Sequence, residues 1–212
     1  MCTGRIDFTH VLRAFSSGVD GVFIGGCRLD DCNYTTQGNY HALNLVLLFK
    51  KIMEQIGINP ERLRIEFMSS GEGNIFAEVV DDFVNKVKES GPIGKDEDID
   101  QNGLNFKLKA IEKLIPYIRL VESERLRAHY NSMEECMEFY SSAEFVELFN
   151  ELIGDKLAMS QIFMLLQEKP HSAGEISRIL GMTQSEISRH LNCSAEQGLV
   201  RFEESQKSFA LA

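Results

Sequence analysis

The stretch Gly21-Val22-Phe23-Ile24-Gly25-Gly26-Cys27 decides the fold of this chain. Three consecutive apolar residues followed by two glycines are typical of a short buried strand that ends in a tight turn. A second apolar stretch, from Leu63 to Met68, predicts another strand further along. Because a helical pattern separates the two stretches, the connection is a right-handed crossover and the strands are predicted to be parallel.

Helices are predicted around the two strands, because apolar residues recur there at helical spacing. They cover about residues 8–17, 40–56 and 74–89. Asp7 and Asn39 are expected to cap the first two of these helices. Alternating helices and strands with short connections are typical of the α/β class. Residues 1–92 therefore predict a small parallel-sheet domain of the flavodoxin- or Rossmann-like kind, short at its N-terminus.

Residues 93–154 are predicted to form an acidic linker and helical segment, with seven basic and thirteen acidic side chains. The linker covers residues 93–102, and helical spacing then runs from Leu104 to Val121 with an interruption expected at Pro116. One or two helices are expected over residues 132–152. Their methionine and phenylalanine residues are interpreted as a helical core and not as a cofactor site.

Residues 155–212 predict a winged-helix domain. Ser172 with Glu175 and Thr183 with Glu186 have the spacing of capping boxes, and the second and third helices have helix-turn-helix spacing. Two short strands follow the last helix. The predicted elements are helices over about 155–168, 173–180 and 184–196 and strands over 199–203 and 208–211.

Composition limits the class of protein. The chain has 212 residues, 43% of them apolar, which is enough for one sizeable domain and a smaller one. No apolar stretch approaches the roughly 20 residues of a membrane span, and no signal peptide is seen, so a cytoplasmic location is expected. In a reducing compartment, the five cysteines are expected to be thiols or metal ligands and not disulfides. The net charge of −10 argues against broad affinity for nucleic acid.

Three of the five cysteines, Cys2, Cys27 and Cys32, are the candidate metal ligands because they fall within the first 32 residues. Cys2 and Cys27 are expected to end neighbouring parallel strands, where α/β folds place their ligands. Structural zinc and iron–sulfur clusters both take four ligands, preferably thiolates. The residues alone leave three interpretations of these cysteines open, namely an iron–sulfur site, a zinc site, or thiols with no metal.

Other residues of ligand type are interpreted as structural. His10 and His41 lie near predicted helix starts, where a histidine is usually solvated or capping. Cys136 and Cys193 lie in separate predicted helices without a neighbouring thiol, so both are expected to be core or surface thiols.

Several motifs of residues 1–92 occur in an order and spacing that resemble one known family. They are Met1-Cys2-Thr3-Gly4-Arg5-Ile6-Asp7, Ala14-Phe15, the stretch from Gly18 to Cys27, Asp31-Cys32, Gly38-Asn39-Tyr40 and Glu61-Arg62-Leu63-Arg64. The family is the delta subunit of methyl-viologen-reducing hydrogenase. The resemblance implies a 2Fe–2S cluster with Cys2, Cys27 and Cys32 among its ligands. It also implies an electron relay between a hydrogenase or formate dehydrogenase module and a heterodisulfide-reductase-type flavin and iron–sulfur subunit.

The sequence departs from the family in two ways. Members usually begin with a further strand that carries another cysteine pair, so the fourth ligand is expected on a strand preceding Cys2. That strand is expected to belong to an earlier start of the chain or to a separate chain. If neither is found, the fourth ligand is expected from a partner protein, or the site is degenerate. The loop Cys27-Arg28-Leu29-Asp30-Asp31-Cys32 keeps both flanking thiols, whereas its middle differs from the family's Cys-His-Pro-Gly-Asp-Cys.

The C-terminal domain resembles ArsR-like winged helices at the level of the fold. Its basic residues at the expected DNA surface are Arg189 and His190 on the third helix and Arg201 and Lys207 on the wing, and acidic residues flank all four. With six basic and seven acidic side chains, the domain neutralises phosphate poorly. Docking to a protein is therefore favoured over DNA binding. The alternative function is a redox- or metal-responsive winged-helix transcription regulator.

Overall fold

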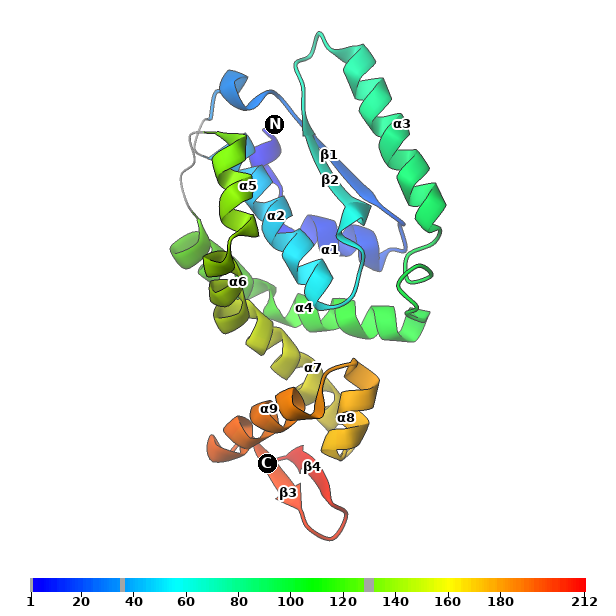
Figure 1. The fold of residues 1–212 in the computed structure, drawn as a ribbon, viewed down its shortest axis with the longest axis vertical. Coiled ribbons are helices and arrows are strands. Elements are labelled where there is room, and N and C mark those ends of the chain that lie inside the picture. Colours follow the sequence, from blue (N-terminus) through cyan, green and yellow to red (C-terminus); the bar gives the residue numbers. More distant parts are fainter. Residues whose placement is uncertain (1, 35–36, 128–131) are drawn as a thin grey trace. The chain divides into compact units, whose positions relative to one another are not determined.

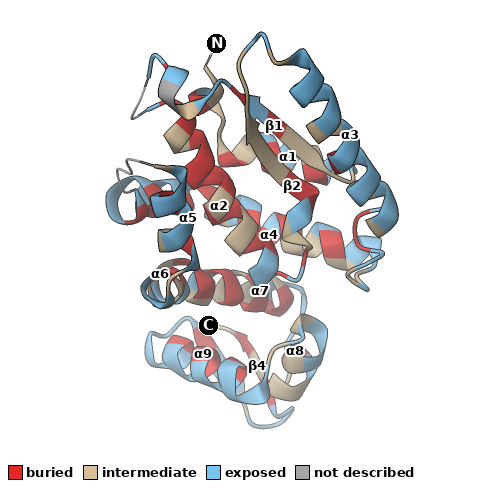
Figure 2. Ribbon diagram, turned by 45° about the horizontal axis from the view of Figure 1, so that its top comes forward, coloured by how far each residue is buried: buried red, intermediate tan, exposed pale blue. Residues whose placement is uncertain are grey.

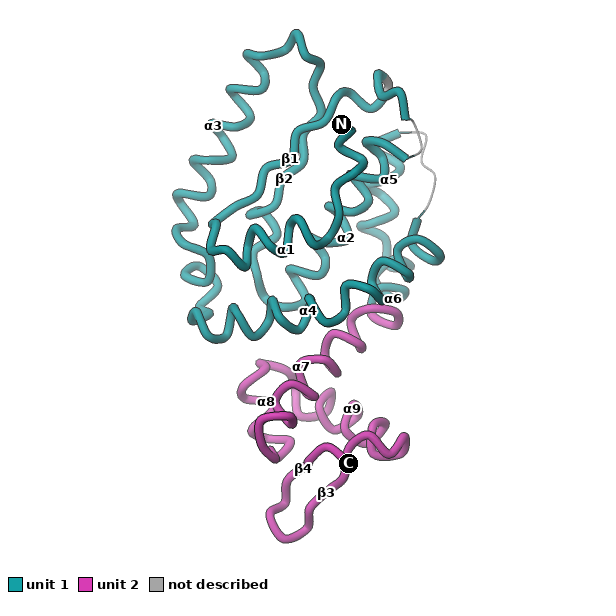
Figure 3. The backbone as a smooth tube through the Cα atoms, turned by 180° about the vertical axis from the view of Figure 1, so that it is seen from behind, with its two compact units in different colours: residues 1–149 teal, residues 150–212 magenta. Residues whose placement is uncertain are grey.

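The computed structural model describes residues 2–34, 37–127 and 132–212. The chain divides into two compact units, residues 1–149 and residues 150–212 (Figure 3). Residues 93–154 are predicted as a segment separate from the first domain, whereas the structure places residues 93–149 in the same unit as residues 1–92. The two units are described separately below.

A two-stranded parallel sheet lies at the centre of the first unit (Figure 1). Strand β1 (Val22–Gly26) pairs with β2 (Leu63–Phe67) in the register that sets Val22 opposite Leu63, which confirms the predicted parallel pairing. Helices α1 (Phe8–Ser16) and α2 (Asn39–Gln55) pack on the sheet. Helix α3 (Gly73–Ser90) covers the other face, where Phe83 lies 5.7 Å from the ring of Phe23.

Helix α2 forms the core of the first unit, and Figure 2 shows most of it as buried. Its long apolar face contacts β2 and also α5 (Met133–Ser141). Helix α4 (Gln101–Val121) packs on α1. These contacts explain why the segment predicted as a separate linker and helical region belongs to the first unit. Helix α6 (Ala143–Phe149) completes it.

The predicted interruption at Pro116 is wrong, because α4 runs through this residue. Proline removes one backbone hydrogen bond from a helix. Ile111, Ile115 and Ile118 on the same helix are each at most 3% exposed, so their burial in the core keeps α4 continuous across the lost bond.

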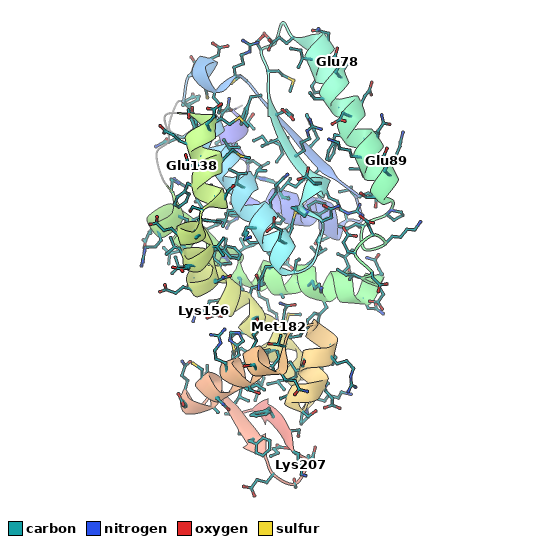
Figure 4. All side chains as sticks on the ribbon, viewed as in Figure 1. Glu78, Glu89, Glu138, Lys156, Met182 and Lys207 are labelled. Carbon is teal, nitrogen blue, oxygen red and sulfur yellow. The ribbon has the colours of Figure 1, made fainter. Side chains whose placement is uncertain are left out.

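Helix α3 differs from α2 in being largely exposed (Figure 2). Of its residues, Phe83 is the one that is fully buried. Its outer face carries charged side chains such as Glu78 and Glu89, which point into solvent (Figure 4).

The second unit is a winged helix, as predicted. Its elements are η5 (Asn150–Gly154, a π-helical turn), α7 (Asp155–Glu168), α8 (Ala173–Leu180), α9 (Gln184–Glu196), β3 (Val200–Glu203) and β4 (Ser208–Leu211). Both predicted capping boxes are present, with the Ser172 and Thr183 hydroxyls accepting from the amides of Glu175 and Glu186 at 3.3 and 3.2 Å. Strands β3 and β4 form an antiparallel hairpin with Lys207 in its turn (Figure 4).

Within the described part of the chain, none of the helices combines the length and the apolar character that crossing a membrane requires.

Candidate metal centre

The three candidate cysteines come together at the carboxyl end of β1. Cys27 directly follows this strand, and Cys32 ends the short 3-10 helix η2 (Leu29–Asp31). Cys2 stands at the N-cap of another 3-10 helix, η1 (Thr3–Arg5), and accepts the Gly4 amide at 3.4 Å. The Thr3 hydroxyl fastens η1 to β1 by donating to the Gly25 carbonyl at 3.0 Å. The strand expected before Cys2 lies outside the described residues.

The Cys32 thiol is the central one of the three. Cys32 is 5% exposed, Cys2 is half-buried and Cys27 is exposed. Burial raises the pKa of Cys32, but hydrogen bonds with the backbone of Asn39 and Tyr34 and with the thiols of Cys2 and Cys27 hold this pKa below its ordinary value. A thiol with a lowered pKa is more readily a thiolate, which is the form that binds a metal.

Close backbone packing brings the segments of Cys2 and Cys32 together. A Cβ on Gly4 would collide with the backbone of Gln37 and Gly38. A Cβ on Gly38 would collide with the Cys32 sulfur. Glycine is the residue that permits such an approach, so both glycines are explained by the assembly of this site.

Asn39 links the start of α2 to the same thiols. It is 1% exposed, and its Nδ2 donates to the Cys27 sulfur at 3.1 Å and also to the Cys27 carbonyl. Its Oδ1 is buried and, within the described part of the chain, has no hydrogen-bond partner. Asn39 is predicted from the sequence only as a helix cap. This was wrong, because Gly38 occupies the N-cap position and Asn39 is the first residue of the helix.

An ion pair anchors the loop that carries Cys27. The guanidinium of Arg28 donates both Nε and Nη2 to the carboxylate of Glu72, at the N-cap of α3. Glu72 also accepts the Ser69 amide at 2.7 Å, and these hydrogen bonds hold its pKa below its ordinary value. The loops after β1 and β2 are thereby joined at one edge of the sheet. Sequence spacing gave no signal for this pair, since the two residues are 44 positions apart.

A pocket of about 460 Å³ opens beside the thiols. It is lined by Cys2, Gly4, Arg5, Tyr34 and Gln37. Tyr34, one of these lining residues, is 62% exposed. Of the three cysteines, Cys2 therefore faces this solvent-accessible pocket.

The chemistry of these donors suits a thiolate-binding metal or cluster, since three thiols, two glycines and the Asn39 amide converge here. Within the described ranges, no three or more Cys, His, Asp or Glu side chains stand in the arrangement of a bound metal ion. Zinc and iron–sulfur clusters take four ligands, so the three thiols supply a set that is one ligand short.

The remaining ligand-type residues lie elsewhere. His10 caps α1, as predicted, by accepting the Asp7 amide at 3.0 Å on its Nδ1. His41 is half-buried beside Glu122, and this burial lowers its pKa. Cys136 is a core thiol with its pKa raised by burial to about 12, whereas Cys193 is exposed.

The predicted DNA surface of the winged helix is largely neutralised by intramolecular contacts. Arg189 donates to both carboxylate oxygens of Asp155, at 2.8 and 3.2 Å. His190 is 5% exposed, and its Nε2 lies 3.6 Å from the Asp155 carboxylate. Arg201 pairs with Glu203 at 3.2 Å. Few of the expected basic residues thus remain free to contact phosphate.

Comparison with known proteins assigns the two ends of the chain to different families. Residues 1–91 match the family described as methyl-viologen-reducing hydrogenase, delta subunit. Residues 158–201 match the family described as bacterial regulatory protein, arsR family.

Curated relatives match the first of these regions. The iron-sulfur subunit of the F420-non-reducing hydrogenase of Archaeoglobus profundus is 43% identical over 91 residues, which are 43% of this chain and 66% of the relative. The vhu iron-sulfur subunit of the F420-non-reducing hydrogenase of Methanococcus maripaludis is 41% identical over 91 residues, covering 43% of this chain and 67% of the relative. A subunit of the ferredoxin:CoB-CoM heterodisulfide reductase of Methanosarcina mazei is 41% identical over 96 residues, which are 45% of this chain and 12% of that protein.

The chain thus spans about two thirds of the hydrogenase subunits and a small part of the reductase subunit. The region matched by the family contains Cys2, Cys27 and Cys32 of this chain. Through residues 1–91, the chain belongs to the methyl-viologen-reducing hydrogenase delta subunit family, and it carries an ArsR-like winged helix at its C-terminal end.

Proposed function

We propose that this protein is a non-catalytic electron-transfer subunit that holds a 2Fe–2S cluster on Cys2, Cys27 and Cys32. The observation that carries the proposal is the convergence of these three thiols at the carboxyl end of β1. When bound, the cluster would accept and release one electron, and the three thiolates would hold it. A further ligand is required from a residue outside these three.

The chain's own residues prepare the thiols for this task. Hydrogen bonds from the Gly4 amide to Cys2 and from Asn39 to Cys27 place donors on two sulfurs. The positive end of α2 lies beside Cys32, which favours the thiolate. The exposure of Cys27 keeps the site near the surface, where a partner protein can approach it.

The relatives indicate the class of partner. Two kinds of relative are named as subunits of a hydrogenase and of a heterodisulfide reductase. We infer that this chain passes electrons between a hydrogenase or formate dehydrogenase module and a heterodisulfide-reductase-type flavin and iron–sulfur subunit. The exposed, acidic surface of α3 and the winged helix are the regions available for docking to them.

The proposal is tested by electron paramagnetic resonance (EPR) on the anaerobically purified protein after reduction with dithionite. The wild type is expected to give the signal of a reduced cluster. Cys27→Ser and Cys32→Ser are expected to lose most of this signal, because each change removes a ligand. Cys136→Ser and Cys193→Ser serve as matched controls, since the Cys136 thiol donates to Asn44 in the core and Cys193 belongs to the other compact unit. Full cluster signals in Cys27→Ser and Cys32→Ser would refute the assignment.

A transcription regulator is the second candidate, and the arsR-family match of residues 158–201 favours it. Exposed uncharged side chains, Gln184, Ser188 and Asn192, follow one line of α9 and are of a kind that reads base edges. The pairing of Arg189 with Asp155 weighs against it. A gel shift at low salt on the DNA upstream of the gene tests this second candidate. A transcription regulator requires salt-sensitive binding at micromolar protein, and the absence of such binding would exclude it.

A further inference from the structure

Asn39 contacts two of the three thiols at once. Its side-chain Nδ2 lies 3.1 Å from the Cys27 sulfur, and its backbone amide forms a hydrogen bond with the Cys32 thiol. Nδ2 also donates to the Cys27 carbonyl. A carbonyl only accepts, so this contact fixes which end of the amide faces the sulfur. The orientation of the donor is therefore set by the backbone.

Helix formation alone does not account for this side chain. Asn39 is 1% exposed, and its buried Oδ1, beside Gly26, has no hydrogen-bond partner among the residues that the structure describes. Burying an unpaired carbonyl oxygen is unfavourable, and an apolar side chain of the same shape would avoid it. Gly38, and not Asn39, stands at the N-cap. What the amide adds at this position is the donor that it directs to Cys27.

A donor directed at a thiolate sulfur favours the more negative state of whatever the sulfur binds. Reduction of an iron–sulfur cluster adds one negative charge, so hydrogen bonds to its cysteine sulfurs raise its reduction potential. The N-terminal end of the 17-residue helix α2 acts in the same direction. Asn39 provides both effects, because its side chain donates to the Cys27 sulfur and its backbone amide belongs to the first turn of α2.

We propose that Asn39 is a positioning residue that holds Cys27 and Cys32 as a ligand pair and raises the reduction potential of the cluster they bind. The proposal deepens the function above and rests on it. Asn39 contacts the two cysteines, so it would act on a bound cluster through them.

Two substitutions and one matched control test this role. Asn39→Leu keeps the approximate shape of the side chain and removes the donor, and Asn39→Asp removes the donor and adds a negative charge. Asn44→Leu is the control, because Asn44 is also buried in α2 and its amide also contacts a cysteine, Cys136, away from the site. Each protein is reconstituted anaerobically with iron and sulfide, and its midpoint potential is measured by EPR-monitored titration. Hydrogen exchange of the amides of residues 27–32 is measured in the metal-free chains.

The midpoint potential is expected to fall in Asn39→Leu, to fall further in Asn39→Asp, and to stay at the wild-type value in Asn44→Leu. Exchange in residues 27–32 is expected to quicken in both Asn39 variants and not in the control. Unchanged midpoint potentials in both Asn39 variants would overturn the proposal. If Asn39→Leu takes up no cluster, the midpoint potential of Asn39→Asp alone tests it. If the wild type itself takes up no cluster, the proposed function fails. Hydrogen exchange of residues 27–32 in the metal-free chains then tests the positioning role. Equal exchange rates in the wild type, both Asn39 variants and Asn44→Leu would reject this role.

Discussion

Arg62 shows how one residue organises the end of the sheet opposite the thiols. Its side chain is 1% exposed, and its guanidinium donates to Glu97 and to four backbone carbonyls. These carbonyls belong to Asp20, just before β1, and to the segment 90–92 that leaves α3. The buried pair therefore joins the loops at that end. In the sequence, Arg62 stands out only as part of a motif, because its partner Glu97 lies in a segment predicted as a separate linker.

Removal of the Arg62 side chain is expected to be strongly destabilising. Arg62→Ala leaves the Glu97 carboxylate, 4% exposed, without its counter-charge, and breaking a buried pair in this way costs about 3–5 kcal/mol. Urea denaturation measures this free energy of unfolding. Lys51→Ala, which breaks the exposed pair with Glu54, serves as control and is expected to cost less than about 1 kcal/mol. Equal losses in the two variants would contradict this role for Arg62.

The same pair predicts a dependence of stability on pH. Burial raises the pKa of Glu97, but hydrogen bonds and the charge of Arg62 hold it below the ordinary value of 4.5. A carboxylate with a lowered pKa in the folded state stabilises the fold above its unfolded pKa, and this stabilisation is lost as the pH falls through the folded pKa. Unfolding free energies measured between neutral pH and pH ~3 are expected to decline less steeply in Glu97→Gln than in the wild type. Parallel curves would disprove this contribution.

At the scale of elements, local signals predicted most helices and strands because caps and apolar spacing are short-range features. The winged helix shows this well, since its three helices have the predicted bounds and both capping boxes are formed. Two predictions were wrong at positions where tertiary packing, and not local sequence, determines the structure. Pro116 is held inside α4 by its buried isoleucines, and Asn39 serves the cysteines and not the helix cap.

Asp7 joins two elements, because it caps α1 and pairs with Arg119 of α4. Burial raises its pKa, but hydrogen bonds from Arg119 and Thr9 lower it to about 2. Asp7→Asn keeps an acceptor for the helix cap and loses the ion pair, whereas Asp7→Ala loses both. We expect Asp7→Ala to lower the unfolding free energy at neutral pH by about 1–2 kcal/mol and Asp7→Asn by less. Thermal and urea denaturation measure both. An equal loss in the two variants would show that the cap contributes nothing.

At the scale of the whole molecule, the sequence separated the winged helix from the rest, but the extent of the first unit was not predictable. The linker composition of residues 93–102 indicates a boundary, whereas the packing of α4 on α1 and of α5 on α2 is a long-range property. For the candidate site, sequence placed Cys27 and Cys32 on one loop. The contributions of Gly38, Asn39 and Glu72 depend on segments that meet only after folding.

The division into two compact units predicts separable stability. Ile187 and Ile52 are both fully buried, the first in α9 and the second in α2. Ile187→Ala is expected to lower protection against hydrogen exchange in residues 150–212, by about 2–4 kcal/mol, and to leave metal binding unchanged. Ile52→Ala is expected to act on residues 1–149 instead. Loss of protection throughout the chain from either change would mean that the two units unfold as one.

The central claim is that Cys2, Cys27 and Cys32 hold an iron–sulfur cluster. The most direct test is the content of iron, acid-labile sulfide and zinc per chain after anaerobic purification. The account predicts iron and sulfide in equal amounts, approaching about two of each per chain, with little zinc. Zinc bound without sulfide, lost in Cys27→Ser and retained in Cys136→Ser, would contradict it and assign the same thiols to a zinc site.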